Sequence, residues 1–222
     1  NAQEISVVYS ARINTASEEL FKETGLPEDM RRALINAYGK VDFSYGLTYA
    51  NNESTFQMLP SNKKQEISFM GQTMDLSAMT EEQSKNVTYK NHQTKQIISK
   101  TLFLGKEFLV TDTIAVEQFN IVENEVKEIL CFECKIAISF DGKNIVWYTE
   151  HIPVADGPIN TNLPGLILEA HLDQYIYTAT SIDDNTKQSI VVPTGGKKMT
   201  NAEFQEMVQK QTEMMKRGTG VL

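Results

Sequence analysis

The sequence predicts a β-rich α+β domain: a single meandering antiparallel sheet, strongly curved into an open or partial barrel, with an early helical hairpin and a C-terminal helix. Three observations lead to this prediction. Apolar and polar residues alternate in most segments between Lys40 and Val192, which is the period of a half-buried strand. Helical spacing of apolar residues is confined to stretches near the two ends of the chain. No linker or repeat divides the sequence, so residues 1–222 are expected to form one domain.

The first strand is predicted over residues 4–14, where every second residue is apolar. Thr15 and Glu18 have the spacing of a capping box, which predicts a short helix after this strand. A second helix is predicted over residues 27–39, because apolar residues recur there at three- and four-residue spacing up to Gly39. Together these two helices would form the helical hairpin.

Residues 61–86 show no sustained period and are expected to form a loop or a marginal insertion, with a short strand at 67–70. The other strands are expected at 42–50, 54–60, 87–90, 96–104, 107–113, 120–122, 127–140, 144–151, 166–171, 174–182 and 189–192. Tight turns are predicted at Asn51-Asn52-Glu53, Gly105-Lys106, Asp141-Gly142-Lys143 and Asp183-Asp184-Asn185. Thr200 and Glu203 form a second capping box, which predicts a helix ending at Gly218.

The charge balance argues against polyanionic partners. With 21 basic and 29 acidic residues the chain has a net charge of −8, which repels phosphate and disfavours binding to nucleic acid or to an anionic membrane. The longest uncharged stretch, residues 157–168, is too short and too polar to span a bilayer. The sequence therefore predicts an acidic globular protein with no nucleic-acid partner and no transmembrane segment.

Cys131 and Cys134 have a C-x-x-C spacing, which is found in redox and zinc sites. Their surroundings read as one long strand, on which residues three apart point to opposite faces. A zinc site would need further cysteine or histidine ligands nearby, and the chain has no other cysteine. We therefore expect two half-buried thiols and no disulfide.

Histidines offer one candidate constellation for an enzyme or a metal site. Glu169 and His171 would share a strand face, and His151 could meet them from a neighbouring strand. The alternative function is accordingly a hydrolase or a metal-handling protein that uses His151, Glu169 and His171. The methionines Met199, Met207, Met214 and Met215 are interpreted as packing residues rather than Cu(I) ligands. The glycine turn at 194–198 lacks the spacing of a phosphate-binding loop.

The segment from Cys134 to Ile167 is the most distinctive part of the chain. It contains Phe140-Asp-Gly-Lys143, Ile145-Val-Trp-Tyr-Thr149, Ile152-Pro153, Gly157-Pro158 and Asn162-Leu-Pro-Gly-Leu-Ile167, with Ser54-x-Phe56 upstream. This pattern resembles the GLPGLI family of Bacteroidetes, with Asn162 in place of the leading glycine and Lys143 where arginine is commoner. The resemblance implies an exported protein of the cell envelope, made with a signal peptide, and it implies no established activity or catalytic residues.

Two further features agree with export. The residues Asn1-Ala2-Gln3-Glu4 are typical of the region around a signal-peptidase cut. Asp112-Thr113-Ile114 is similar to the tripeptide that is O-glycosylated in exported proteins of that phylum. We therefore expect a periplasmic or outer-membrane-associated location.

The prolines and glycines between residues 153 and 165 predict a rigid crossover between two strands. Two interpretations remain open: the crossover packs the sheet, or it forms the rim of an apolar binding site. The ligand-binding residues of the second interpretation are Trp147, Tyr148, Pro158, Leu163, Pro164, Gly165, Leu166 and Ile167. The predicted function is a non-enzymatic binding or interaction module whose apolar concave sheet face takes an apolar ligand, a peptide or an envelope protein partner. No cofactor is predicted.

Overall fold

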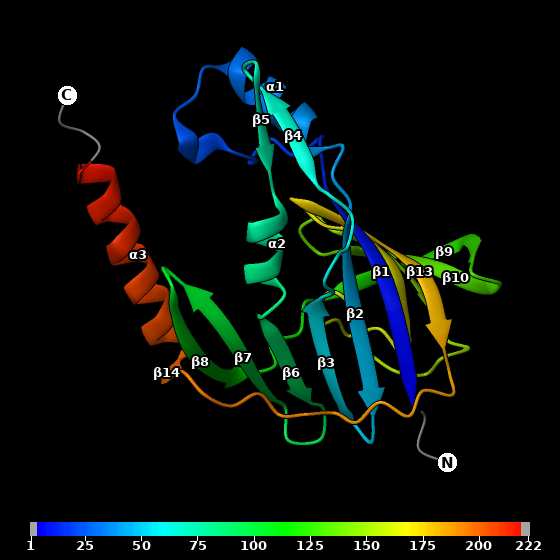
Figure 1. Cartoon of the computed structure of the whole chain (residues 1–222). Helices are drawn as coiled ribbons and strands as arrows, with labels where there is room; N and C mark the ends of the chain where they lie inside the picture. The colour runs from blue at the N-terminus through cyan, green and yellow to red at the C-terminus, as the bar shows by residue number, and fades with distance from the viewer. Residues whose placement is uncertain (1–3, 219–222) are drawn as a thin grey trace.

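The computed structural model describes residues 4–218 and is built around one mixed sheet of 12 strands (Figure 1). The strand order is β14-β8-β7-β6-β3-β2-β1-β13-β12-β11-β10-β9. The strands are β1 (Ile5–Ile13), β2 (Phe43–Ala50), β3 (Glu53–Met58), β6 (Val87–Asn91), β7 (Gln96–Phe103), β8 (Lys106–Thr113), β9 (Phe119–Ile129), β10 (Phe132–Ser139), β11 (Ile145–Thr149), β12 (Leu166–His171), β13 (Tyr175–Asp183) and β14 (Lys197–Thr200). The helices are α1 (Glu28–Tyr38), α2 (Ser77–Gln83) and α3 (Asn201–Gly218), and a hairpin of β4 (Glu66–Phe69) and β5 (Gln72–Asp75) forms a second, two-stranded sheet.

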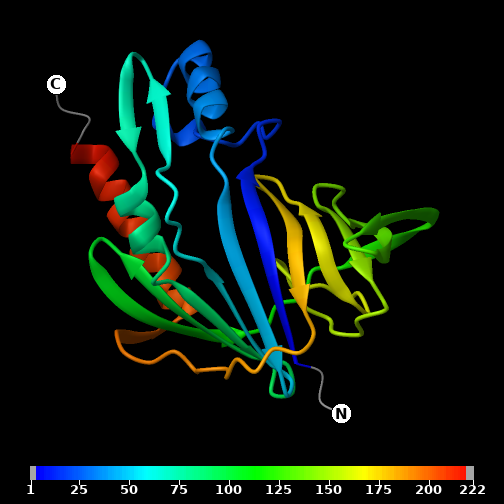
Figure 2. The same ribbon diagram turned by 45° about the vertical axis from the view of Figure 1, so that its right-hand side comes forward.

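The prediction of a β-rich chain is correct, but the predicted architecture is wrong. The large sheet is open, with β9 and β14 at its two edges, and it is neither closed nor strongly curled into a partial barrel. It is also not purely antiparallel, because β14 pairs with β8 in the parallel sense. The physical reason is the route of the chain after β13: residues 184–196, which we call the strap, cross the sheet and deliver β14 to the far edge (Figure 2).

The predicted helical hairpin is absent from the described residues. The second helix forms as α1, but the segment before it contains only turns and a 3-10 turn at Lys22–Thr24. The Asn14 Oδ1 atom accepts a hydrogen bond from the Ala16 amide at 3.2 Å, and the Ser17 hydroxyl accepts one from the Glu19 amide at 3.3 Å. These local side-chain turns compete with helix formation, which explains why the capping spacing was misleading.

Several predicted turns and the C-terminal helix are confirmed. Asn51 and Asn52 have φ values of 53° and 64°, the left-handed conformation that a two-residue hairpin turn requires. The Asp141-Gly142 turn joins β10 to β11. At the start of α3 the Thr200 amide donates to Glu203 Oε2 at 2.8 Å and the Glu203 amide donates to Thr200 Oγ1 at 3.2 Å, which is a reciprocal capping box.

Three other segments differ from the prediction. In the 61–86 region the short strand expected at 67–70 forms as β4, but β5 and α2 were not predicted there. Residues 189–192 belong to the irregular strap rather than to a strand. The predicted long strand over 127–140 is broken by a turn at Leu130 and Cys131, both with positive φ. Neither residue type normally signals such a turn, so the hairpin of β9 and β10 was missed.

The core joins two antiparallel meanders. The first contains β1–β3 and β6–β8, the second contains β9–β13, and the two meet where β13 pairs with β1. The largest buried cluster takes side chains from both meanders and from the crossover between β11 and β12; it consists of Ile5, Val7, Tyr9, Leu47, Cys134, Ile152, Val154, Leu166, Leu168 and Ala179. A smaller cluster of Ala37, Val41, Ile67 and Leu76 holds α1 against the β4–β5 hairpin, at one end of the sheet in Figures 1 and 2. None of the helices within residues 4–218 has the length and apolar character of a membrane-spanning helix.

Candidate functional site

The eight predicted ligand-binding residues lie together around β11, β12 and the crossover, but most of them face the core. Tyr148, Leu163, Leu166 and Ile167 are buried, with at most 2% of their surface exposed. The Tyr9 hydroxyl donates to the Ile167 carbonyl at 2.7 Å, which fixes this region to β1. Trp147 and Pro158 are half-buried, and Pro164 is exposed. None of the eight lines either of the two cavities described below, so their place in the structure is one of packing, and their binding role stays a prediction.

Gly165 shows why the crossover packs so closely. A Cβ atom at this position would lie 2.1 Å from the Thr149 carbonyl oxygen, which is far inside van der Waals contact. Gly157 has a φ of 154°, and a Cβ there would lie 2.7 Å from the Ile167 Cβ. These glycines therefore allow the crossover backbone to rest directly on β11 and β12.

The structure brings together two members of the histidine constellation. The Glu169 carboxylate contacts His171 Nε2 at 2.5 Å and Lys127 Nζ at 2.8 Å. Burial raises the pKa of Glu169, but the hydrogen bonds and charges of Lys127 and His171 outweigh it and hold the pKa below its ordinary value. His151 is exposed beyond the end of β11 and makes no side-chain bond to this pair. Within residues 4–218 no group of three His, Cys, Asp or Glu side chains is placed to hold a metal ion.

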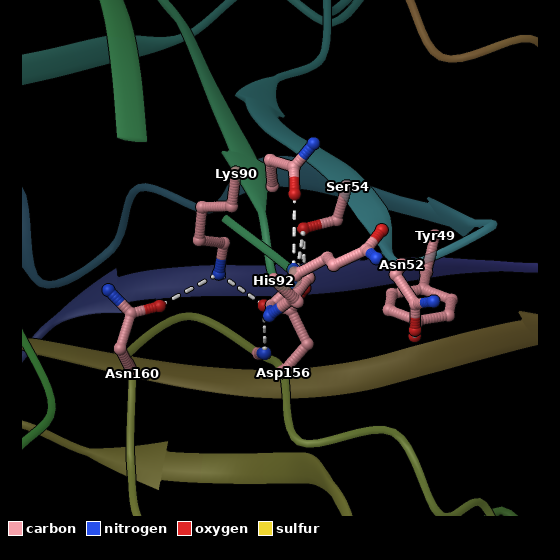
Figure 3. Close-up of polar contacts among 10 residues, drawn as sticks. Tyr49, Asn52, Ser54, Lys90, His92, Asp156 and Asn160 are labelled. Atoms are coloured by element: carbon pink, nitrogen blue, oxygen red, sulfur yellow. Dashed lines mark hydrogen bonds and ion pairs between the residues drawn. The ribbon is translucent and has the colours of Figure 1, made fainter. Parts of the chain in front are cut away.

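A different polar cluster, which we call the Asp156 cluster, is buried between the crossover and the sheet (Figure 3). The Asp156 carboxylate accepts hydrogen bonds from Ser54 Oγ at 2.5 Å and from the Gly157 amide at 2.7 Å, and it lies 2.8 Å from His92 Nε2. Lys90 forms an ion pair with Oδ1, the oxygen that also accepts from the Gly157 amide, whereas Ser54 and His92 contact Oδ2. The side chains of Asp156 and Lys90 are 0% and 4% exposed, so this charge pair is removed from water.

Strand register assembles the Asp156 cluster. Tyr49 on β2, Ser54 on β3 and Lys90 on β6 are successive partners across the sheet, so they form one row on the same face. His92 follows β6, and its amide donates to the Asn52 carbonyl at 2.8 Å, which links the β6–β7 turn to the β2–β3 turn. Asp156 is brought onto this row by the crossover. Ser54 and Gly157-Pro158 belong to the pattern that resembles the GLPGLI family, but nothing in the sequence connects them with Lys90.

Two neighbouring side chains keep the buried Asp156 carboxylate ionised. Burial alone would raise the pKa of Asp156, but Lys90 and His92 outweigh burial and hold the pKa well below its ordinary value. Because the ionised carboxylate can only accept hydrogen bonds, both Ser54 Oγ and His92 Nε2 act as donors to it.

Ser54, His92 and Asp156 do not form a catalytic triad. In a triad the imidazole bridges serine and carboxylate through its two different nitrogens. Here one nitrogen, Nε2, faces both groups, at 3.1 Å from Ser54 Oγ and 2.8 Å from the carboxylate. Ser54 is also fully buried and donates its proton directly to Asp156. Ser54 is therefore a support for the carboxylate and not a nucleophile.

A groove of about 540 Å³, which we call the strap groove, lies on the opposite face of the sheet. Register places Ser6, Thr48, Thr55, Val87 and Lys100 on this face, across β1, β2, β3, β6 and β7. The strap forms the other wall and is attached at one end. There Ser6 Oγ donates to Thr186 Oγ1 at 3.1 Å, and Thr48 Oγ1 donates to Gln188 Oε1 at 3.1 Å.

Further along the strap, Val191 and Val192 line the strap groove and are 71% and 42% exposed. On the sheet side Leu59 lies over Gly46, where a Cβ atom would be only 3.0 Å from the leucine Cδ2. The groove thus has apolar walls, made of Leu59, Val87 and the strap valines, above a floor of hydroxyl and amide side chains.

The strap groove is positively charged in an acidic protein. Lys85 and Lys100 line it, and its lining contains no aspartate or glutamate. Lys100 is paired with Glu107 at 3.3 Å, whereas Lys85 forms no ion pair with any residue in the described part of the chain. An anionic group in the groove would therefore find an ammonium without a partner.

Comparisons with known proteins give the fold only. No family model matches the sequence and no curated protein matches it, so the GLPGLI resemblance stays a prediction. Solved structures similar to this chain include PNGF-II in two crystal forms, each with a TM-score of 0.56 and 14% identity over 94% of this chain. The chain spans about a third of PNGF-II, 33% and 34% of that chain in the two structures. At this identity the similarity shows only that a part of a larger protein has a similar fold, and it carries no activity across.

Proposed function

We propose that this chain is a non-enzymatic binding module that holds an acidic, apolar peptide segment in the strap groove. The observation that carries the proposal is the unpaired Lys85 beside apolar walls in a lining free of carboxylates. Apolar side chains of the peptide would pack against Leu59, Val87 and the strap valines, and a carboxylate would approach Lys85. The hydroxyl and amide groups of the floor provide hydrogen bonds for a peptide backbone, which a hydrocarbon chain would leave unused.

The apolar and cationic character of the strap groove can be tested with 8-anilinonaphthalene-1-sulfonate, a fluorescent probe that combines apolar rings with an anionic group. We expect its fluorescence to rise on binding and Lys85→Glu to weaken binding about threefold to tenfold, because an attractive charge becomes a repulsive one. Lys143→Glu is the matched control, since it changes the net charge equally in the exposed turn between β10 and β11. Equal affinities for the two variants would contradict a site at Lys85.

The class of ligand can be tested by displacing the probe. An acetylated peptide of alternating valine and leucine that ends in a free carboxylate should displace it, and the same peptide with an amidated C-terminus should be weaker by a similar factor. Displacement by decanoate but not by the peptide would replace the peptide with a fatty acid as the ligand. If neither of the two peptides nor decanoate displaces the probe, the proposed peptide site is wrong.

We further propose, from the resemblance to the GLPGLI family, that the protein is exported to the periplasm or the outer membrane. Asn1, Ala2 and Gln3, which carry the signal-peptidase pattern, lie outside the residues that the structure describes. Thr113 of the glycosylation tripeptide is exposed at the end of β8, where an enzyme could reach it. Cell fractionation with an antibody against the chain tests the location, and recovery in the cytoplasmic fraction alone would contradict it.

A further inference from the structure

A second, smaller cavity of about 240 Å³ lies beside the Asp156 cluster and shares no lining residue with the strap groove. Its polar lining comes from two hairpin turns, β2 and the crossover, and consists of Tyr49, Asn52, His92, Lys95, Asn160 and Thr161. Ile114, Val116 and Ala155 supply an apolar side. No carboxylate is among its lining residues.

Hydrogen bonds already made on the protein side leave this cavity rich in donors. Asn52 Oδ1 accepts a bond from the Tyr49 hydroxyl at 3.1 Å, and Asn160 Oδ1 accepts one from Lys90 at 2.9 Å. With both amide oxygens engaged, each amide keeps its NH₂ group, and neither NH₂ donates to any other described residue. Lys95 sits in a left-handed turn conformation with φ 60°, is exposed, and has no ion pair among residues 4–218.

His92 adds a group whose tautomer is set by its hydrogen bond to Asp156. Because Nε2 donates to the Asp156 carboxylate, the neutral ring must carry its lone pair on Nδ1. Nδ1 makes no hydrogen bond within the described chain, and the side chain is 19% exposed at the cavity wall. Protonation of Nδ1 would convert this acceptor into a further donor beside Lys95.

We propose that this cavity binds a small organic carboxylate, with Lys95 and protonated His92 as its cationic partners and the two amides as neutral donors. The apolar side formed by Ile114 and Val116 suits a short alkyl group better than the fully hydrated oxygens of a phosphate. The titratable groups that face His92 are the Asp156 carboxylate, which is itself paired with Lys90, and the Tyr49 ring, whose centroid is 5.6 Å from the imidazole. Lys90 offsets the charge of Asp156, so Lys95 and a protonated imidazole supply the positive charge that an anion meets. Binding should therefore be tighter at acidic pH.

The experiment follows the His92 ring in protein labelled with ¹⁵N-histidine. Without a ligand at pH 7.5, the ring should show the tautomer protonated on Nε2 and bare on Nδ1. Butyrate added at pH 5.5 should shift the His92 signals saturably, with at least fivefold weaker binding at pH 7.5, because a lone pair on Nδ1 repels a carboxylate whereas a proton there donates to it. The opposite tautomer, or equal affinity at the two pH values, would overturn the role of His92.

Variants separate this site from the strap groove. Lys95→Gln should weaken butyrate binding about threefold to tenfold and Lys95→Arg should restore it, because the exposed turn needs only the charge. Lys85→Gln, in the strap groove, should leave butyrate binding unchanged. Unaltered binding in Lys95→Gln, or tighter binding of inorganic phosphate than of butyrate, would overturn the proposal, and neither result bears on the peptide groove.

Discussion

The pair of Lys90 and Asp156 places two opposite charges where water does not reach them. Removing two charges from water carries a large desolvation penalty, which the ion pair and its hydrogen bonds must offset. Ser54, His92, Asn160 and the Gly157 amide complete those hydrogen bonds. Within residues 4–218 no buried side-chain nitrogen or oxygen lacks a partner, so the penalty is met by a fully bonded network.

Asp156→Ala should therefore lower the free energy of unfolding by about 3–5 kcal/mol, because it leaves the buried Lys90 ammonium unpaired. The double change Asp156→Leu with Lys90→Met should cost clearly less, since it removes both charges and fills similar volume. Urea denaturation of the single and double variants measures the difference. If the single variant is the more stable of the two, the ion pair is not the cause.

The depressed pKa of Asp156 also predicts a dependence of stability on pH. The folded pKa lies below the unfolded value of about 3.9, so the carboxylate contributes stability that is present above about pH 4 and is lost as pH falls toward the folded pKa. The unfolding free energy of the wild type should fall below pH 4 more steeply than that of the double apolar variant. Parallel pH profiles would show that Asp156 does not carry this acid sensitivity.

The two cysteines should differ sharply in reactivity. Cys131 is exposed in the β9–β10 turn, whereas Cys134 is buried and burial raises the pKa of its thiol to about 11. Iodoacetamide at pH 8 should label one thiol in the folded protein, and Cys131→Ser should abolish that labelling. Labelling of both thiols at equal rates would contradict the burial of Cys134. The expectation that the cysteines are unpaired is confirmed, but they are one exposed and one buried thiol rather than two half-buried ones.

At the scale of single elements, the crossover between β11 and β12 depends on the close approach at Gly165. Gly165→Ala should destabilise the fold by about 3 kcal/mol or more, because the added methyl group meets the Thr149 carbonyl oxygen of β11 and the backbone must move. Gly218→Ala at the end of α3 is the control, since nothing lies within 4 Å of its Cβ position. Thermal unfolding of both variants measures the effect. Equal melting temperatures would show that the crossover backbone can shift away from Thr149 at little cost in free energy.

Local sequence signals predicted elements well where one residue type controls the backbone. Asn51-Asn52, Asp141-Gly142 and the Thr200–Glu203 capping box each act through bonds within a few residues, and each is found as predicted. The same reasoning failed at Thr15–Glu18, where Asn14 and Ser17 offered competing local bonds, and at Leu130-Cys131, where the turn has no sequence signal. Spacing alone therefore cannot decide between a helix cap and a side-chain turn.

At the scale of the whole molecule, one core unites the two meanders. Cys134 and Leu168 of the second meander belong to the same buried cluster as Val7 and Leu47 of the first. We therefore expect the sheet to unfold in a single transition, with Trp147 fluorescence on β11 and far-UV circular dichroism giving the same midpoint in urea. Separate midpoints would show that the meanders are independent domains.

Both proposed binding sites are formed by segments that are far apart in the sequence and meet only in the folded molecule. The strap groove needs the strap to cross from β13 to the β8 edge, and the carboxylate cavity needs two hairpin turns and the crossover to meet. The sequence pointed instead to His151, Glu169 and His171, because Glu169 and His171 are two residues apart and His151 was expected on a neighbouring strand. In the structure β11 ends at Thr149, so His151 lies beyond the strand pairing that would have brought it to them. The residues that the structure does assemble, His92, Lys90 and Asp156, are up to 66 positions apart.

The sequence by itself determined the β-rich character, most turns, the C-terminal helix and the acidic surface, because alternation, turn residues and charge act locally or as sums. Tertiary structure decided that the sheet is open and mixed and that Asp156 packs on the row of Tyr49, Ser54 and Lys90. It also decided that Lys85 and Lys95, which form no ion pair among residues 4–218, line cavities. These features depend on strand order and register, and a shift of one residue in register would move Ser54 and Lys90 to the other face. No property of a short segment carries that information, since it arises from the packing of both meanders on one core.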